Sequence, residues 1–452
     1  MTPRLGANRN GGGLRMLAIA IAATVAGCDT IGSLFDFDKP KERLEGERIS
    51  VMSLESSLEP DPRLADLQVR LPRPYENEEW PQVGGYPGHA MHHLALAERP
   101  RVVWRTDVGS GSDRDQRIPG QPVVGGGRVY AMDARSRVSA FDMATGNRVW
   151  GVNLTPKDED SGAIGGGIAF DRGRIYAATA YGEAVALDAA SGKPLWRQKL
   201  SAPARVPPSV DGNLVFIVGH DNQIVALDGD SGRTVWSYTS VSEGAGIVGA
   251  GNPAVEGGVV VAPFSSGDLV ALREDSGRIA WTDSLIRAQR LSSVATINDI
   301  AGSPVIDRGR VYAISHSGRM VAHDLRSGDR IWEQSIGGVQ PPWVAGDFLF
   351  VITIDADLVC LSRRDGRIRW VRPLARWERP KDRKDPIVWY GPILASDRLI
   401  VVSNRGRALS VSPYSGEIIG AVELPAGASR APVVAGGMLF ILTDGASIVA
   451  MK

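Results

Sequence analysis

An eleven-residue segment that recurs along the chain constrains the fold more than any other feature of this sequence. Its first copy reads AFDMATGNRVW (140–150), and the next reads ALDAASGKPLW (186–196). Seven copies occur, and they begin at residues 140, 186, 226, 271, 322, 360 and 410. The spacing averages about 45 residues, a period that is typical of propeller blades built from four β-strands. The repeat therefore predicts an all-β ring of such blades.

The residues before each copy have the pattern of short β-strands joined by tight turns. In PVVGGGRVYAMDARSRVSAFD (122–142), β-branched and aromatic residues alternate with other residues, and glycines mark a bend. Other repeats bend at Asp-Gly or Ser-Gly. Each repeat is therefore predicted to form three strands, then the turn of the eleven-residue segment, and then a fourth strand that carries its Trp.

Three positions of the segment have separate structural roles. The Asp side chain can accept backbone N–H groups of the turn, the Gly suits a positive φ, and the Trp offers a large flat surface to a neighbouring blade. We interpret all of them as structural, and we predict no catalytic residue. The Asp residues are Asp142, Asp188, Asp228 and Asp324. The Gly residues are Gly146, Gly192, Gly232, Gly277, Gly328, Gly366 and Gly416, and the Trp residues are Trp150, Trp196, Trp236, Trp281, Trp332 and Trp370.

The two ends of the repeat region indicate how the ring closes. Residues 431–452 contain three predicted strands and stop where an eighth segment would begin. The missing fourth strand occurs upstream as RVVWRTDVG (101–109), which contains Trp104. We therefore predict an eight-bladed propeller over residues 100–452, whose last blade is closed by an N-terminal strand that removes the open edge. Because copy seven ends in Gly420 instead of Trp, seven blades remain the alternative.

The N-terminal residues have the layout of a secretory signal peptide. Arg4, Arg9 and Arg15 precede the apolar run MLAIAIAATVAGC, which ends at Cys28 and is too short to span a bilayer. The ending VAGC resembles the bacterial lipobox, which predicts removal of residues 1–27 and acylation of Cys28, palmitate included. Several acyl chains on one residue anchor a protein stably. An ordinary signal peptide with an unrelated cysteine is the alternative.

Residues 28–99 are polar and interrupted by prolines, and we interpret them as a tether and N-terminal extension that partly lies against the propeller. Asp29 follows the lipidated position. In enteric lipoproteins an Asp there tends to hold the protein at the inner membrane, so both membranes stay open. The segment 77–88 contains Trp80, and we expect it to pack against the ring.

Composition narrows the possible partners. Lys plus Arg and Asp plus Glu both number 51, so the charge implies no nucleic-acid partner. The chain has two cysteines, and we predict no disulfide because Cys28 is the expected lipidation site. Cys360 lies in an apolar run and is expected to be a buried small hydrophobe. His89, His92 and His93 could supply imidazoles to a metal. No carboxylate or Cys completes that set, so we favour a polar surface segment and predict no metal site.

The A-x-D-x-x-[ST]-G-x-x-x-W pattern resembles the tryptophan-docking repeat of PQQ-type propellers, a superfamily that contains quinoprotein dehydrogenases and the non-enzymatic BamB family. With both this repeat and the lipobox, the chain resembles the BamB family, which consists of lipoproteins of the outer-membrane β-barrel assembly (BAM) machinery. The resemblance implies a scaffold with neither enzymatic activity nor a cofactor. It further implies a monomer within a hetero-oligomeric complex, anchored in the outer membrane and facing the periplasm, which binds the POTRA repeats of BamA and other BAM subunits.

The resemblance also implies where partners bind. In the family, the loop equivalent to residues 284–304 carries an R-L-S-D-V-D stretch implicated in POTRA contact. Here Arg290, Leu291 and Ser292 match, but Ser293 and Ala295 replace the two acids. A second contact corresponds to residues 246–253, where the family's Arg is absent. The candidate partner-binding residues are Ile286, Arg287, Arg290, Leu291, Ser293, Ile247 and Val248. A solvated loop without a partner is the alternative.

The sequence is also compatible with two other functions. A propeller that binds another protein or a cell-wall polysaccharide would present a row of aromatics, and Trp343, Trp377 and Trp389 lie outside the repeat. Two of them flank a charged insertion at 376–390, which is a further interface candidate. A PQQ-dependent dehydrogenase is the other possibility. Against it, the chain contains no adjacent Cys pair, and the repeat already explains most of its acids as turn residues.

Overall fold

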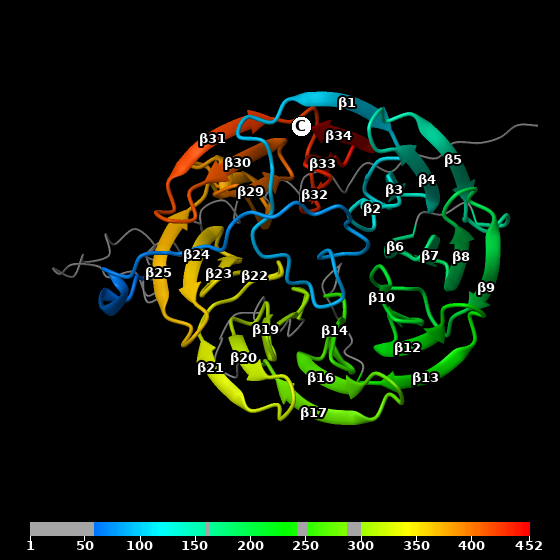
Figure 1. Ribbon diagram of the computed structural model, residues 1–452, viewed down its shortest axis with the longest axis horizontal. Helices are drawn as coiled ribbons and strands as arrows, with labels where there is room; N and C mark the ends of the chain where they lie inside the picture. Colours follow the sequence, from blue (N-terminus) through cyan, green and yellow to red (C-terminus); the bar gives the residue numbers. More distant parts are fainter. Residues whose placement is uncertain (1–57, 160–162, 242–250, 287–299) are drawn as a thin grey trace, which may run out of the picture. The chain divides into compact units, whose positions relative to one another are not determined.

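Eight antiparallel sheets of four strands each stand around a common axis (Figure 1). The computed structural model describes residues 58–159, 163–241, 251–286 and 300–452, and residues 58–452 form one unit. The predicted signal peptide and Cys28 lie outside the described residues. The eight-bladed propeller is confirmed, and the seven-bladed alternative is wrong because the seventh copy of the repeat belongs to a complete sheet.

Blades 1 to 4 follow one another along the chain, and in each the first strand lies nearest the axis and the fourth lies at the rim (Figure 1). Blade 1 consists of β2 (Val123–Gly125), β3 (Arg128–Met132), β4 (Arg137–Asp142) and β5 (Arg148–Asn153). Blade 2 consists of β6 (Gly166–Asp171), β7 (Arg174–Thr179), β8 (Glu183–Asp188) and β9 (Pro194–Lys199). Blade 3 consists of β10 (Ser209–Asp211), β11 (Leu214–Val218), β12 (Gln223–Asp228) and β13 (Thr234–Thr239). Blade 4 consists of β14 (Ala254–Glu256), β15 (Val259–Pro263), β16 (Asp268–Arg273) and β17 (Ile279–Ser284).

Blades 5 to 7 repeat the same order, and a separate hairpin precedes blade 7. Blade 5 consists of β18 (Val305–Asp307), β19 (Arg310–Ile314), β20 (Met320–Asp324) and β21 (Arg330–Gln334). Blade 6 consists of β22 (Trp343–Ala345), β23 (Phe348–Ile352), β24 (Asp357–Ser362) and β25 (Ile368–Pro373). The hairpin consists of β26 (Trp377–Arg379) and β27 (Lys384–Pro386). Blade 7 consists of β28 (Trp389–Ala395), β29 (Arg398–Ser403), β30 (Arg407–Val411) and β31 (Ile418–Glu423).

Blade 8 joins the two ends of the propeller, as the sequence predicts. Its inner strands are β32 (Val433–Ala435), β33 (Met438–Leu442) and β34 (Ser447–Met451), and its outer strand is β1 (Val102–Asp107). Arg101 and Lys452 exchange two backbone hydrogen bonds, of 2.8 and 2.9 Å, just beyond the paired strands. This pairing closes the ring and leaves no broken sheet between its first and last blades.

Each recurring Trp docks on the repeat segment of the next blade. Trp150 Nε1 donates a 3.0 Å hydrogen bond to the Ala189 carbonyl in the turn of blade 2. A Cβ on Gly192 would lie 2.7 Å from the ring of Trp150, so only glycine leaves room for the indole. In the same turn, Asp188 Oδ1 accepts from the N–H and the hydroxyl of Ser191 at 2.8 and 2.6 Å. The same contact between indole and glycine recurs at Trp104–Gly146, Trp196–Gly232, Trp236–Gly277, Trp281–Gly328, Trp332–Gly366 and Trp370–Gly416.

The missing Trp of copy seven has a structural reason. Gly420 lies in β31, and the blade that follows is blade 8. In blade 8 the third and outer strands are β34 and β1, which belong to opposite ends of the chain and are not joined by a repeat turn. No recurring glycine is therefore present to receive an indole from β31, and seven docked tryptophans serve eight blades.

The antiparallel order of the strands gives the ring two different ends. One end, the repeat face, carries the turns that join the first strand to the second and the third to the fourth. The other end, the loop face, carries the turns between the second and third strands and the connections between blades. Leu285, in the connection after β17, donates its backbone N–H to Gly267 in such a turn at 2.8 Å. The connections that contain the candidate partner residues therefore begin and end on the loop face.

Candidate functional site

An extended segment before β1, residues 75–96, crosses the middle of the ring, and we call it the strap. Figure 1 shows this segment in blue between the innermost strands of the blades. It follows the 3₁₀-helix η2 (Pro62–Leu64), which lies beside blade 6, where the Asp61 N–H donates to the Ile368 carbonyl at 2.8 Å. The strap therefore brings a segment that precedes the first blade strand to the middle of the ring.

The strap hydrogen-bonds to all eight blades in their order around the ring. The innermost strand of a blade leaves one edge unpaired, and the strap bonds to this strand or to the turn that follows it. For blades 8, 1, 2 and 3 the bonds are Gly436 N to Asn77 O (2.7 Å), Val124 N and O with Trp80 (both 2.8 Å), Phe170 N to Pro81 O (2.6 Å), and Val210 N to Gln82 Oε1 (2.7 Å). For blades 4 to 7 they are Val255 N to Pro87 O (2.8 Å), Ile306 N to Gly88 O (2.8 Å), Trp343 Nε1 to His92 O (2.7 Å), and Ser396 N to Leu94 O (2.8 Å).

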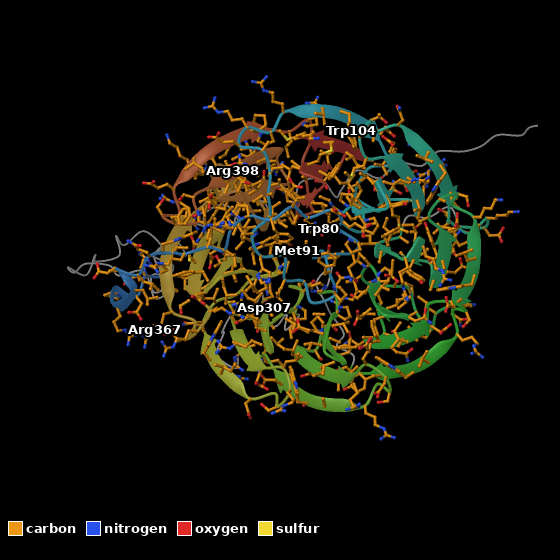
Figure 2. All side chains as sticks on the ribbon, in the orientation of Figure 1. Trp80, Met91, Trp104, Asp307, Arg367 and Arg398 are labelled. Atoms are coloured by element: carbon orange, nitrogen blue, oxygen red, sulfur yellow. The ribbon has the colours of Figure 1, made fainter. Side chains whose placement is uncertain are left out.

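Apolar side chains of the strap fill the axis. Trp80, Met91 and Leu94 are at most 1% exposed. Trp80 stacks on Trp343 of blade 6 with 6.4 Å between ring centroids. Figure 2 shows Trp80 and Met91 near the middle of the ring. Burying each of these side chains stabilises the folded chain by roughly 2–3 kcal/mol. The expected packing of the segment around Trp80 is therefore confirmed, and it extends much further than the sequence suggested.

The three histidines of the strap are not the polar surface segment that the sequence favoured. His89 and His93 are only 4% and 1% exposed, because the strap lies inside the ring. His89 Nδ1 lies 2.8 Å from the Pro304 carbonyl, and His93 Nδ1 lies 2.7 Å from that of Pro72. His92 Nε2 lies 3.3 Å from Asp307 Oδ1. Across the described ranges, no three His, Cys, Asp or Glu side chains gather as a metal site would require.

Burial and local partners set the charge state around the strap. Burial lowers the pKa of His89 to about 4, against a smaller opposing effect of the Pro304 carbonyl. Burial would raise the pKa of Asp307, but the hydrogen bond with His92 and the nearby Arg363 guanidinium outweigh it and hold that pKa below its ordinary value. Arg363 Nη1 lies 2.6 Å from Asp307 Oδ2. At neutral pH the strap therefore meets a charged Asp307–Arg363 pair and a neutral His89.

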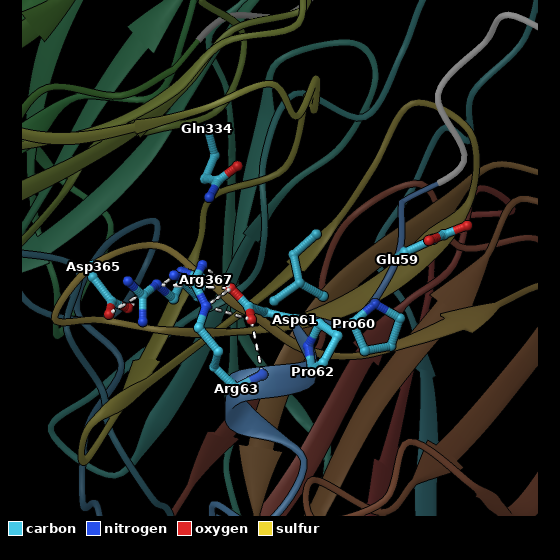
Figure 3. A pocket seen from close by; sticks show the side chains of 9 residues that line it. Glu59, Pro60, Asp61, Pro62, Arg63, Gln334, Asp365 and Arg367 are labelled. Atoms are coloured by element: carbon cyan, nitrogen blue, oxygen red, sulfur yellow. Dashed lines mark hydrogen bonds and ion pairs between the residues drawn. The ribbon is translucent and has the colours of Figure 1, made fainter.

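A pocket of about 670 Å³ lies between the start of the described chain and the rims of blades 5 and 6 (Figure 3). Its charged side chains pair with one another. Asp61 contacts Arg63 at 2.6 Å and Arg367 at 3.7 Å, and Arg367 also contacts Asp365 at 3.5 Å. The hydrogen bond from Arg63 lowers the pKa of Asp61 to about 2. Because these charges satisfy one another, the pocket offers no clear basis for selecting a ligand.

The candidate partner residues are only partly covered by the structure. Ile286 is 37% exposed and follows the fully buried Leu285 at the start of the connection between blades 4 and 5. The remaining candidates lie outside the described residues and stay predictions: Arg287, Arg290, Leu291, Ser293, Ile247 and Val248. The charged insertion at 376–390 includes the hairpin of β26 and β27 and starts from the connection between blades 6 and 7, at the loop face.

The tryptophans outside the repeat do not form an exposed aromatic row. Trp343 is buried under the strap, and Trp389 is buried with its Nε1 donating to the Ala375 carbonyl at 2.9 Å. Only Trp377, on the hairpin, is partly exposed. The feature that would favour a polysaccharide-binding propeller is therefore not formed by these residues. In the described part of the chain, no helix has the length and apolarity that a membrane span requires.

Eight four-stranded blades with docked tryptophans define the class of the molecule, a tryptophan-docking β-propeller. The chain belongs, within that class, to the family of the outer membrane protein assembly factor BamB, whose model matches residues 97–150 and 134–372. The match begins directly after the strap and extends through blade 6. The strap and the hairpin therefore lie outside the part of the chain that the family model recognises.

Individual relatives agree with this assignment. The chain is 25% identical to the BamB of Yersinia pestis over 296 residues, which cover 60% of this chain and 70% of the relative. It is 24% identical to the BamB of Shewanella oneidensis over 351 residues, which cover 76% and 86%.

Solved structures of the same fold include a relative and an enzyme. The crystal structure of BamB from Moraxella catarrhalis superposes with a TM-score of 0.65 at 21% identity, over 78% of this chain and 100% of that one. A quinohemoprotein alcohol dehydrogenase from Comamonas testosteroni gives 0.64 at 13% identity, over 82% and 80%. At such identities these likenesses show the fold alone.

Proposed function

We propose that this protein is a non-enzymatic scaffold of the BAM complex that binds the POTRA repeats of BamA and assists the folding and insertion of outer-membrane proteins. In this proposal residues 1–27 are removed, and lipid on Cys28 holds the chain at the outer membrane, where it faces the periplasm. The observation that carries the proposal is the family match, which spans β1 and blades 1 to 6. The relatives with this name are described as assembly factors of outer membrane proteins.

The filled axis supports a scaffold over a dehydrogenase. Ligand sites are usually concave and largely formed before the ligand arrives. On the axis of this ring, a cofactor would have to displace Trp80 and Met91 and break the backbone hydrogen bonds of the strap. Such a displacement exposes apolar surface and unpairs strand edges, which is a costly way to build a binding site.

The loop face is the end of the ring that best suits a protein partner. The strap occupies the axis and lies against turns of the repeat face, such as that at Gly436. Connections between blades vary without disturbing the sheets that hold them, which is why binding residues often lie there. Ile286 begins one of these connections as an exposed apolar residue, and apolar and Arg side chains are suitable anchors for an interface.

The test is an affinity pull-down of the tagged full-length chain from detergent-solubilised membranes. Wild type should co-purify BamA, and Arg290→Ala and Leu291→Ala should deplete it at least several-fold. Ile419→Ala is the control, because Ile419 is 54% exposed on β31 at the rim, away from the proposed loop. Equal recovery with all variants would leave the scaffold in place but reject the loop. Absence of BamA from the wild-type eluate would favour a propeller with a different partner.

A further inference from the structure

The part of the strap between Pro87 and Leu94, which we call the arc, contains His89, and the surroundings of this histidine favour its neutral form. His89 Nδ1 must donate to the Pro304 carbonyl at 2.8 Å, so its lone pair lies on Nε2. That Nε2 atom is buried and has no hydrogen-bond partner. The ring packs against Gly84, where a Cβ would lie 2.8 Å from its Cδ2 atom. A second proton would therefore bring a positive charge to a buried position where no acceptor of the described residues hydrogen-bonds to it.

His93 is fixed in the same tautomer at the end of the arc. Its Nδ1 donates to the Pro72 carbonyl at 2.7 Å, and its Nε2 accepts the N–H of Asp397 at 2.9 Å. The Asp397 carboxylate lies 3.8 Å from the same Nε2 atom and accepts from the Tyr414 hydroxyl.

Several charged groups of the described residues lie around the arc, and each has a partner or faces the backbone of the strap. Asp307 of β18 is paired with Arg363 at 2.6 Å and with His92 at 3.3 Å, and Arg308 lies 4.0 Å from it. Glu256 of blade 4 faces Gly88, where a Cβ would lie 3.2 Å from its Oε2 atom. Near His93, Arg398 of β29 donates to the carbonyls of Ala97 and Glu98. Among the described residues, none of these groups hydrogen-bonds to His89.

We propose that the strap is an acid-sensitive latch, in which protonation of His89 releases the arc between Pro87 and Leu94 from blades 4 to 6 and opens the axis of the ring. The earlier part of the strap, from Asn77 to Gln82, contains no histidine, so we expect it to stay bound to blades 8 and 1 to 3. The pH of the surroundings would then determine whether the innermost strands of blades 4 to 6 are bonded to the strap or accessible.

The direction of the pH effect follows from linkage. The pKa of His89 is about 4 when the arc is latched and returns to the ordinary 6.5 when the arc opens. The stabilising contribution of the neutral imidazole is fully present above pH 6.5 and is lost as the pH falls toward 4. Between neutral pH and pH 5, the ratio of latched to open arc should decrease by about 30-fold.

Hydrogen exchange of single backbone amides in the full chain tests the latch. The Val255 and Ile306 amides donate to Pro87 and Gly88, whereas the Val124 and Phe170 amides donate to Trp80 and Pro81. We expect protection at Val255 and Ile306, corrected for intrinsic exchange, to decrease by about 30-fold between pH 7.5 and pH 5. Protection at Val124 and Phe170 should stay unchanged. Equal pH dependence at all four amides, or none at any, would overturn the proposal.

The matched variant is His89→Asn. The Asn side-chain NH₂ can replace Nδ1 as donor to Pro304, Asn tolerates the φ of 63° at this position, and it does not titrate. The variant should stay latched at pH 5, and a full decrease of protection in it would show that another group controls the arc. If the variant is already open at pH 7.5, the wild-type profile decides: a decrease centred between pH 4 and 6.5 supports the latch, and unchanged protection down to pH 4 rejects it.

Discussion

Gly192 and Gly173 both adopt a left-handed backbone conformation, with φ of 72° and 77°. Their surroundings differ. A Cβ on Gly192 would lie 2.7 Å from the indole of Trp150, whereas a Cβ on Gly173 would have no heavy atom within 4 Å. The pair therefore separates the conformational cost of replacing a glycine from the cost of blocking a docked tryptophan.

Gly192→Ala should lower the free energy of unfolding by about 2–4 kcal/mol, because it adds a clash with Trp150 to the backbone strain. Gly173→Ala should cost only about 1 kcal/mol, for the backbone strain alone. Urea unfolding followed by tryptophan fluorescence measures both variants. Equal losses would mean that docking does not depend on the glycine contact.

The residues of the repeat were predictable because their partners lie either a few residues away or one repeat away. Asp188 finds Ser191 three residues further on, and Trp150 finds Gly192 at a distance that the period itself gives. His89 and His93 were not predictable in the same way. Their carbonyl and amide partners at Pro304 and Asp397 are more than 200 residues away, so the sequence around them read as a polar surface segment.

At the scale of the element, the outer strands β25 and β31 differ in one decisive position. Trp370 of β25 is 6% exposed and donates to the Pro413 carbonyl at 3.0 Å in blade 7. Gly420 occupies the equivalent position of β31, and a Cβ there would only reach ordinary contact with Ser410 at 3.6 Å. The strand therefore has room for a larger residue but lacks a docking site for it on blade 8.

Trp370→Ala should destabilise the chain by about 3–5 kcal/mol, because it empties a buried site between blades 6 and 7. Gly420→Trp should change the unfolding free energy by no more than about 0.5 kcal/mol, because the added indole stays in solvent. Thermal and urea unfolding of both variants give the comparison. A clear stabilisation by Gly420→Trp would show that blade 8 accepts an indole without a repeat turn.

The strap shows where the pattern of strands stops being informative. Alternating apolar residues and turn glycines predicted every blade, because each sheet is made almost entirely from consecutive residues. The strap has no such alternation, and its path is fixed by hydrogen bonds to eight blades that are spread over more than 300 residues. Its prolines and glycines read as a flexible tether, although in the structure they follow the inner surface of the ring.

At the scale of the whole molecule, the proposed anchor and the propeller are separate parts of the chain. Cys28→Ser should abolish palmitate incorporation and move the protein from the membrane to the soluble fraction, because the acyl chains supply the membrane affinity. Metabolic labelling and cell fractionation measure the effect. Cys360→Ser is the control, since Cys360 is fully buried and burial raises its pKa well above the ordinary value. Absence of label from the wild type would point to an ordinary signal peptide, and label that persists in Cys28→Ser would place the acyl chains on another residue.

The path of the strap also determines the order in which mechanical tension would reach the propeller. Tension applied at Leu58 first meets η2 and the single backbone bond between Asp61 and Ile368 on blade 6. It then has to detach the strap from one blade after another, because separate hydrogen bonds hold it to each blade, before it reaches β1. The β1–β34 pair that closes the ring is the last of these contacts to bear the tension. The strap should therefore detach and extend before the propeller opens.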